Sequence, residues 1–218
     1  MENSSHFQIN DYLKPGRHAH LVGIGGVSMR PLGLVLRSMG MQISGSDMNA
    51  SVSTDELMAK GIAVSIGHRA ENIEGADCVI RTAAANNDNP EIAAARAAGI
   101  PIFERAQAWG YIMKAYRHAI CVSGTHGKTT TTSMLTQIFM EAGKDPTVMI
   151  GGSLPLLGAG HRVGQGDTII LESCEYCNSF LNFFPTTAVV LDIDADHLDF
   201  FKDLEDVKHS FRRFAELV

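Results

Sequence analysis

The sequence predicts an α/β protein whose sheets are built mainly from parallel strands. Short apolar segments recur along the chain and alternate with segments whose apolar residues follow helical spacing. Glycine or proline stands at the ends of several helical segments, as is typical of helix termini. The alternation begins afresh near residue 119, after a helical stretch. Because strands that alternate with helices form βαβ units, the pattern indicates two consecutive units of this kind.

The first unit is expected to contain five short strands and three helices. The strands are predicted at 19–24, 41–45, 62–66, 78–82 and 100–103. The helices are predicted at 29–39, 54–60 and 90–98. Ser53 or Thr54 is the expected cap of the second helix, and Pro90 opens the third. We assign residues 1–106 to this unit and expect a Rossmann-like parallel sheet.

The second unit is assigned to residues 107–218, after a connecting helix over 106–116. Its first strand, 119–122, runs directly into a glycine-rich turn. The other expected elements are a helix at 130–142, strands at 168–172 and 188–193, and a helix at 203–217. The expected sheet has few strands, and no capping signal follows Val218. We therefore expect an incomplete second domain, in a chain that is the N-terminal fragment of a longer protein.

Composition narrows the class of protein. Of the 218 residues, 45% are hydrophobic and 19% are charged, which is typical of a globular protein with a sizeable core. The formal net charge is −6 and Lys and Arg are scattered, so we expect no nucleic-acid partner. No apolar run reaches the roughly 18–20 residues of a membrane span. With a polar N-terminus and four cysteines, the chain is expected to be cytoplasmic, without a disulfide scaffold or a membrane partner; its oligomeric state is not indicated.

The strongest motif is the glycine-rich turn Gly124–Thr129, between an expected strand and an expected helix. Backbone N–H groups at such a helix N-terminus can converge on phosphate oxygens. Lys128 can neutralise the β- and γ-phosphates, and the Thr129 hydroxyl can reach a Mg²⁺ ion. Val122 stands where the general motif has its first glycine, so this is the shorter G-x-x-G-K-T loop. The second unit is therefore expected to be part of a P-loop-type α/β ATPase domain.

Two further residues follow strands of the same expected sheet. Glu172 ends one apolar strand, and His197 lies shortly after another. Ligands bind at the carboxyl ends of parallel strands, so both side chains could complete the shell of one or two Mg²⁺ ions. Mg²⁺ prefers oxygen, which makes histidine the less usual partner. A solvated glutamate and a satisfied core histidine remain open as alternatives.

Other polar and glycine motifs carry weaker signals. Gly23–Ser28 resembles a dinucleotide fingerprint, with Asp47 placed to hold a ribose hydroxyl, although such glycine turns also arise from packing. Cys174 and Cys177 form a C-x-x-C pair, but the remaining cysteines fall within buried strands, which argues against zinc. The histidines at 18 and 20 are interpreted as exposed residues at a strand entry.

Seven segments together resemble the Mur ligase family: HLVGIGGVSM, ISGSDM, IGHRAENI, ANNDNPE, SGTHGKTTTTSM, ESCEYCNSFL and DADHLDFF. The resemblance runs through nearly all of the chain from about Ala19. It implies a protein with a UDP-sugar domain, a central ATPase and a C-terminal Rossmann-like domain, of which the last is absent from this chain. His126 within the phosphate loop fits the branch that joins L-alanine to UDP-N-acetylmuramate.

The resemblance also implies roles for individual residues. In the second unit, Lys128 is the catalytic lysine and the magnesium ligands are Thr129, Glu172 and His197. The implied ATP-binding residues are Gly124, Thr125, His126, Gly127, Lys128, Thr129 and Thr130. The implied UDP-sugar-binding residues are Gly25, Gly26, Val27, Asp47, His68, Thr82 and Arg105.

The activity implied is an ATP-dependent ligation in peptidoglycan precursor synthesis, with ATP and Mg²⁺ as cofactors. The muramate carboxylate becomes an acyl phosphate, which the amine of L-alanine then attacks. Two alternatives stay open: a recycling ligase that adds a tripeptide to the same UDP-sugar, and a non-catalytic UDP-sugar-binding module. The 218-residue chain alone is expected to be incomplete for catalysis.

Two residues depart from the family pattern. Asp192 stands where the family usually has asparagine, and Cys174 replaces the common aspartate after the Glu172 strand. Both are expected near the metal, so they bear on its coordination.

Overall fold

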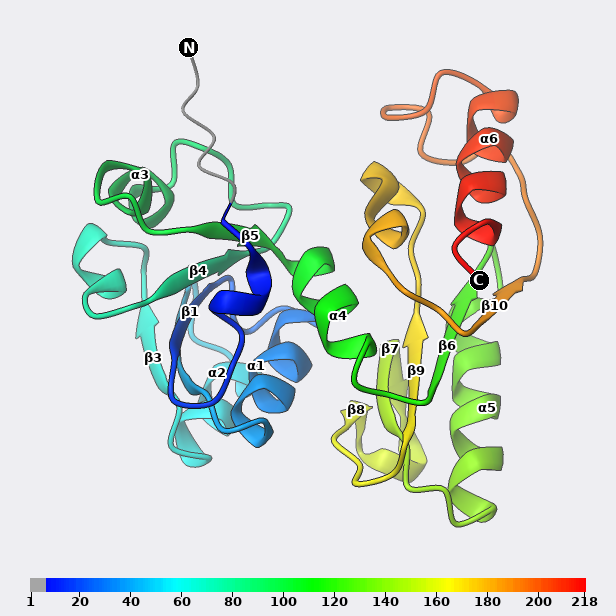
Figure 1. Cartoon of the computed structure of the whole chain (residues 1–218), viewed down its shortest axis with the longest axis horizontal. Helices are drawn as coiled ribbons and strands as arrows, with labels where there is room; N and C mark the ends of the chain where they lie inside the picture. The colour runs from blue at the N-terminus through cyan, green and yellow to red at the C-terminus, as the bar shows by residue number, and fades with distance from the viewer. Residues whose placement is uncertain (1–6) are drawn as a thin grey trace. The chain divides into compact units, whose positions relative to one another are not determined.

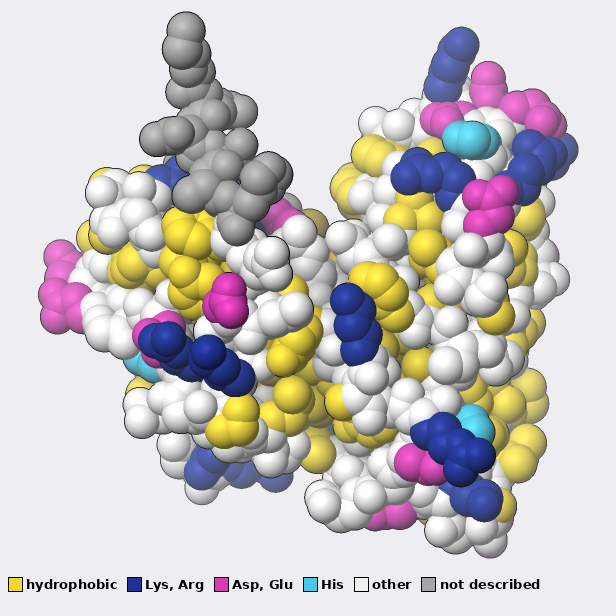
Figure 2. Space-filling view, viewed as in Figure 1, with side chains coloured by type: hydrophobic (Ala, Val, Ile, Leu, Met, Phe, Trp, Pro, Cys, Tyr) yellow, Lys and Arg dark blue, Asp and Glu magenta, His cyan; other side chains and the backbone are white. Residues whose placement is uncertain are grey.

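The computed structural model describes residues 7–218, and the chain forms two compact units, Met1–Ala108 and Trp109–Val218. Each unit has a central sheet with helices packed against it, which confirms the α/β fold class (Figure 1). No helix among the described residues is long and apolar enough to cross a membrane. On the face drawn in Figure 2, Lys and Arg side chains are dispersed in small groups among polar and apolar residues.

Unit 1 contains a wholly parallel five-stranded sheet in the order β3-β2-β1-β4-β5. Its strands are β1 His18–Val22, β2 Gln42–Asp47, β3 Ala63–Ile66, β4 Cys78–Arg81 and β5 Ile102–Glu104. Its helical elements are η1 Ile9–Asp11, α1 Met29–Ser38, α2 Val52–Ala59, η2 Ala70–Ile73 and α3 Pro90–Ala97. The strand order reverses between β1 and β4, and in doubly wound sheets ligands bind at the carboxyl ends of the strands beside such a point.

The start of α2 differs from the prediction. The helix begins at Val52, and its cap is Ser51 rather than Ser53 or Thr54. Ser51 Oγ accepts a hydrogen bond from the Thr54 amide, and Thr54 Oγ1 accepts one from the Ser51 amide. This reciprocal pair satisfies two amides that the first helical turn leaves without partners. The polar run before Thr54 contains several possible caps, and only the backbone geometry selects among them.

Unit 2 contains a five-stranded mixed sheet in the order β10-β6-β9-β7-β8. Its strands are β6 His118–Ser123, β7 Thr147–Leu154, β8 Ala159–Arg162, β9 Thr168–Glu172 and β10 Thr187–Val190. Its helical elements are α5 Lys128–Glu141, η3 Pro155–Leu157, η4 Tyr176–Asn182 and α6 Leu204–Ala215, and α4 Arg105–Met113 precedes its first strand. β8 is antiparallel to β7, and the other neighbouring strands are parallel.

The expectation that this sheet has few strands was wrong, because the sequence reading missed β7 and β8. Both strands lie in a glycine-rich segment, and glycine ordinarily weakens a strand. Here the glycines permit a close backbone approach: a Cβ on Gly160 would lie 2.2 Å from the Gly152 carbonyl oxygen. The pairing of β7 with β8 is also irregular between Met149 and Leu154.

The last helix fixes the segment that follows β9. α6 is strongly amphipathic and buries Val207, Phe211 and Phe214. Phe214 stacks on Phe180 of η4 with ring centroids 4.5 Å apart, and Phe211 meets the same ring edge-on at 5.3 Å. Aromatic pairs of this kind contribute about 0.5–1.5 kcal/mol beyond their area burial. They anchor η4, which directly follows the polar residues at the carboxyl end of β9.

Candidate functional site

The phosphate loop joins β6 to α5. α5 begins at Lys128, two residues earlier than predicted, and Gly127 is its N-cap with φ 79°. A left-handed conformation favours glycine at this position. Gly124 also has a positive φ of 137° and lies close to Leu191 and Asp192, so a side chain there would be both strained and crowded. Backbone amides at the N-terminus of such a helix can bind an anion.

The loop is held in shape by the segment that follows β10. Asp192 Oδ1 accepts a hydrogen bond from the His126 amide at 2.8 Å, and its carbonyl oxygen accepts one from the Thr125 amide at 3.2 Å. Thr125 Oγ1 in turn accepts a hydrogen bond from the Asp194 amide at 2.8 Å. In this structure Asp192, one of the two departures from the family pattern, therefore contacts the loop backbone.

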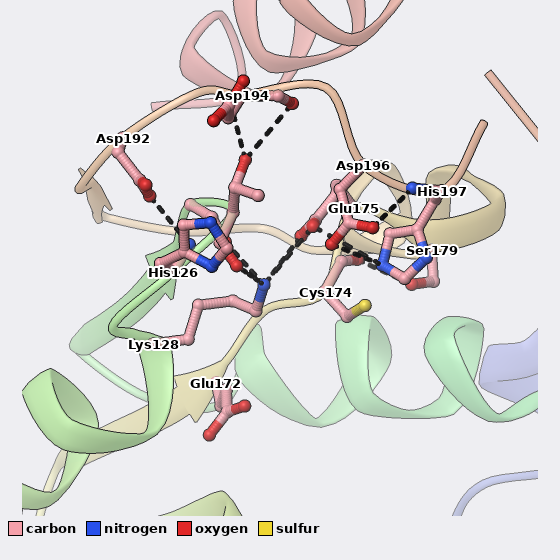
Figure 3. A network of polar contacts seen from close by, with 12 residues as sticks. His126, Lys128, Glu172, Cys174, Glu175, Ser179, Asp192, Asp194, Asp196 and His197 are labelled. Carbon is pink, nitrogen blue, oxygen red and sulfur yellow. Dashed lines mark hydrogen bonds and ion pairs between the residues drawn. The ribbon is translucent and has the colours of Figure 1, made fainter.

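The Lys128 ammonium forms hydrogen bonds and an ion pair with neighbouring residues. Its ammonium donates hydrogen bonds to the carbonyl oxygens of Gly124 and Thr125 and lies 3.2 Å from Glu175 Oε2 (Figure 3). The Glu175 side chain is only about 2% exposed, so Lys128 compensates a buried charge. The sequence analysis did not identify Glu175 as a site residue. It stands three residues beyond Glu172 in the same motif, after the end of β9, where the strand pattern no longer indicates which side chains are buried.

The proposed magnesium ligands fall into two groups. Thr129 Oγ1 donates a hydrogen bond to Glu172 Oε1 at 3.1 Å, and Glu172 Oε2 accepts one from the Gly151 amide at 2.7 Å. This hydroxyl–carboxylate pair is an oxygen donor set of the kind that Mg²⁺ prefers. His197 has different neighbours: its Nε2 lies 3.7 Å from Glu175 Oε1 and 3.8 Å from Asp196 Oδ2.

His197 is held in an uncommon backbone conformation. Its φ is 53°, a left-handed value that few residues other than glycine adopt. Its ring lies against Tyr176, with centroids 4.7 Å apart. The Tyr176 hydroxyl donates a hydrogen bond to Asp199, which raises the pKa of Tyr176 to about 12. His197 is partly exposed rather than a core histidine, which removes that alternative.

A substitution at Gly151 tests the carboxylate geometry. A Cβ at this position would lie 2.5 Å from Glu172 Oε1, so Gly151→Ala is expected to displace the carboxylate and break its hydrogen bond. We expect Mg²⁺-dependent nucleotide affinity to fall by about tenfold, the effect of losing one charge-assisted hydrogen bond. Calorimetry with MgATP measures this, with Ser153→Ala, at an exposed position of the same strand, as the control. Unchanged MgATP affinity in Gly151→Ala would contradict the role given to Glu172.

A second candidate site lies in unit 1 at the carboxyl ends of its strands. A pocket of about 550 Å³ is lined by residues from several loops, among them Asp47, His68 and Thr82. Asp47 Oδ2 accepts a hydrogen bond from the Gly25 amide at 2.9 Å, so it closes the glycine turn as well as facing the pocket. The structure thus brings together three of the seven residues implied for the UDP-sugar.

The other four residues implied for the UDP-sugar lie outside this lining. Gly25, Gly26 and Val27 form the turn before α1, where Val27 is 58% exposed, and Arg105 opens α4. Several glycines of the turn are closely packed: a Cβ on Gly23 would lie 2.8 Å from Thr82. The packing explanation for the glycines therefore holds alongside the binding one.

A buried polar cluster supports this pocket, and sequence reasoning missed it. His20 is 1% exposed, so its interpretation as an exposed strand-entry residue was wrong. Its Nε2 lies 3.7 Å from Oε2 of Glu91, which is fully buried at the start of α3. Glu91 also accepts hydrogen bonds from Ser46 and Asn72 and lies 3.2 Å from His68 Nδ1. In the sequence, the position of Glu91 directly after Pro90 at the start of a helix was the one feature that could have drawn attention to this residue.

Burial and hydrogen bonding have opposite effects on the pKa of Glu91. Burial raises the pKa of this carboxyl, but His20 and the hydrogen bonds from Ser46 and Asn72 outweigh that effect and lower the pKa to about 2. Glu91 is therefore a buried carboxylate ion. At Cys78 and Cys121 burial prevails instead, and it raises the pKa of each thiol to about 12.

The fold and the loop define a P-loop α/β protein with a second, Rossmann-like unit. Two family models match the chain: the Mur ligase family catalytic domain over residues 18–117, and the Mur ligase middle domain over residues 122–218. The chain belongs to the Mur ligase family. The resemblance inferred from the motifs is thereby confirmed.

Individual relatives agree with this assignment. The chain is 48% identical over 209 residues to a UDP-N-acetylmuramate–L-alanine ligase of Clostridium botulinum, covering 95% of this chain and 46% of the relative. It is 52% identical over 206 residues to the same ligase of Agathobacter rectalis, with 94% and 45% covered. The chain thus spans about half the length of the curated relatives it matches.

Solved structures of similar fold are also ligases that act on UDP-N-acetylmuramate. The UDP-N-acetylmuramate–alanine ligase of Thermotoga maritima superposes with a TM-score of 0.84 at 31% identity, covering 91% of this chain and 47% of that one. The UDP-N-acetylmuramate:L-alanyl-γ-D-glutamyl-meso-diaminopimelate ligase of Neisseria meningitidis superposes with a TM-score of 0.83 at 26% identity, covering 93% and 68%.

Proposed function

We propose that this chain supplies the UDP-sugar-binding and ATP-binding parts of a ligase that joins L-alanine to UDP-N-acetylmuramate in peptidoglycan precursor synthesis. The observation that carries the proposal is the phosphate loop at the start of α5, with Lys128 and the Thr129–Glu172 pair beside it. The identity of 48–52% to relatives that bear this ligase's name supports the choice of substrates. The cytoplasmic location expected from the sequence belongs to the same proposal.

In this proposal unit 2 (residues 107–218 in the sequence assignment) binds ATP. The loop from Gly124 to Thr130 holds the phosphates through those of its amides that Asp192 does not bind, and the Lys128 ammonium leaves its carbonyl and carboxylate partners to neutralise the β- and γ-phosphates. Glu172, Thr129 and His197 would hold Mg²⁺, which supplies positive charge to the transferring phosphoryl group. These residues position the γ-phosphate for transfer to the muramate carboxylate, and the resulting acyl phosphate is the species that the amine of alanine attacks.

Unit 1 (residues 1–106 in the same assignment) binds the UDP-sugar. The pocket beside the β1–β4 switch point has the position that nucleotides take in such sheets. We assign Asp47 to the nucleoside and Gly25, Gly26 and Val27 to the diphosphate. His68, Thr82 and Arg105 complete the assigned groove.

Asp47 offers a test of this assignment. Asp47→Asn keeps the size of the side chain but removes its charge, and we expect the affinity for UDP-N-acetylmuramate to fall by about tenfold, since hydrogen bonds to charged groups contribute about 1.5–3 kcal/mol. Calorimetry on the 218-residue chain measures the change. Asp11→Asn, at an exposed residue of η1, is the control and is expected to bind like the unchanged chain. Failure of the unchanged chain to bind the UDP-sugar would remove the function proposed for unit 1.

One solved structure supports a second candidate function, the ligation of a tripeptide to the UDP-sugar. The Neisseria meningitidis ligase acts, by its name, on a tripeptide, and its TM-score of 0.83 is close to the 0.84 of the alanine ligase. Both branches share the UDP-sugar and the phosphate loop, so these two sites do not separate them. Assaying the product of the complete gene with L-alanine and with the tripeptide does: ligation of the tripeptide alone would replace the proposed second substrate.

A further inference from the structure

The carboxyl ends of β9 and β10 bring together four side chains: a thiol, an imidazole and two carboxylates. Cys174 and Glu175 follow β9, and Asp196 and His197 lie in the segment after β10 (Figure 3). One ligand atom from each of Cys174, Glu175 and His197 lies within 4.8 Å of the other two. His197 Nε2 is also 3.8 Å from Asp196 Oδ2. Sulfur, nitrogen and oxygen donors thus face one small volume.

This donor set shares His197 with the one proposed for magnesium but differs from it in the other ligands. Thr129 and Glu172 offer oxygen, which suits Mg²⁺. A thiolate and an imidazole instead select borderline-soft cations such as Zn²⁺. We propose that Cys174, Glu175 and His197, with Asp196 beside them, form a binding site for a thiophilic divalent cation of the Zn²⁺ type.

The spacing of the donors suits this class of ion. Nitrogen and oxygen ligands at about 2.0–2.2 Å from a tetrahedral zinc ion lie roughly 3.3–3.6 Å from one another. The Glu175–His197 separation of 3.7 Å and the Asp196–His197 separation of 3.8 Å are slightly longer than this. Small side-chain rotations bring the third ligand from at most 4.8 Å to the same spacing.

The local charges also balance. A Cys174 thiolate with the carboxylates of Glu175 and Asp196 carries three negative charges, against the two positive charges of the ion and one on Lys128. Glu175 is placed to serve both cations, since its Oε1 faces His197 while its Oε2 lies 3.2 Å from Lys128. The neighbouring lysine therefore does not exclude the ion.

The C-x-x-C spacing alone did not show which other ligands could bind a metal together with Cys174. A zinc site on Cys174 and Cys177 lacked two further ligands, and the other two cysteines are buried. The structure supplies a carboxylate and an imidazole to Cys174 instead. Cys177, at φ 54° and exposed, is not a member of the cluster.

The site also has a consequence for the proposed function. His197 cannot serve this ion and the magnesium shell at once, so Zn²⁺ is expected to compete with Mg²⁺-dependent nucleotide binding. That consequence rests on the proposed function, whereas cation binding itself does not.

The test uses Cd²⁺, whose bonds to thiolate give an ultraviolet charge-transfer band. Titrating the metal-free 218-residue chain is expected to produce this band with one ion per chain, and Zn²⁺ is expected to displace it while millimolar Mg²⁺ does not. Cys174→Ser is expected to remove the band, and His197→Gln to weaken Cd²⁺ affinity by about 100-fold, an equal share of the binding free energy of a structural zinc site. Cys177→Ser, the same change three residues away, is expected to leave the band intact.

Alkylation provides a second measurement that does not depend on the fold of a variant. In the unchanged chain, Zn²⁺ is expected to slow modification of Cys174 but not of Cys177. A band that survives Cys174→Ser, a band lost in Cys177→Ser, or equal alkylation of Cys174 with and without Zn²⁺ would each overturn the proposal. Loss of ATP binding with an intact Cd²⁺ band would instead count against the proposed function alone.

Discussion

Replacing Lys128 with methionine is expected to weaken MgATP binding by about 10- to 100-fold. The ammonium is the only side-chain cation that the phosphate loop itself contributes, and a charge-assisted bond to phosphate contributes about 1.5–3 kcal/mol. Calorimetry of the 218-residue chain with MgATP measures the loss. Lys144→Met, at an exposed lysine beyond α5, is the matched control and is expected to bind as the unchanged chain does.

The same substitution also leaves a buried carboxylate without its partner. Glu175 lies 3.2 Å from the ammonium and is about 2% exposed, and removing one partner of such a pair commonly costs about 3–5 kcal/mol. Lost binding in Lys128→Met could then reflect lost folding. The double variant Lys128→Met, Glu175→Gln separates the two effects: we expect recovered stability and persistent loss of MgATP binding. Recovery of both would show that Lys128 serves the fold and not the nucleotide.

The order of elements and the phosphate loop could be predicted because their signals are local. The helix stops at glycine and the apolar strands of unit 1 follow rules that operate within a few residues. The strand before Gly124 and the helix after Gly127 likewise needed no knowledge of the rest of the chain. β7 and β8 escaped prediction because their glycines serve contact between two backbones, and that contact exists only in the sheet.

The partners of buried charges could not be predicted for the same reason. Glu91 and His20 are 71 residues apart, and nothing in the sequence near either one reports the other. Lys128 and Glu175 are 47 residues apart and meet only because β6 and β9 are neighbours in the sheet. Sequence pattern locates the chemistry-bearing residues, while topology decides which of them compensate one another.

Glu91→Gln is expected to destabilise unit 1 by about 3 kcal/mol at pH 7. The pKa of Glu91 is about 2 in the folded chain against an ordinary value of 4.5, and each unit of difference corresponds to about 1.36 kcal/mol. Ser46 and Asn72 both donate to this carboxylate, so the amide of glutamine would turn a donor toward a donor. Hydrogen exchange of the β1 and β2 amides measures the loss within unit 1.

The pH dependence identifies the charge as the cause. Because the folded-state pKa is depressed, the stabilisation is fully present above pH 4.5 and is lost as the pH falls from about 4.5 to about 2. The exchange difference between the unchanged chain and Glu91→Gln should therefore be largest near neutrality and shrink across that interval. Glu74→Gln, at an exposed carboxyl just after η2, should show no such difference at any pH. A Glu91→Gln deficit that stays constant down to pH 2 would mean that packing, rather than the buried charge, stabilises the cluster beneath the pocket.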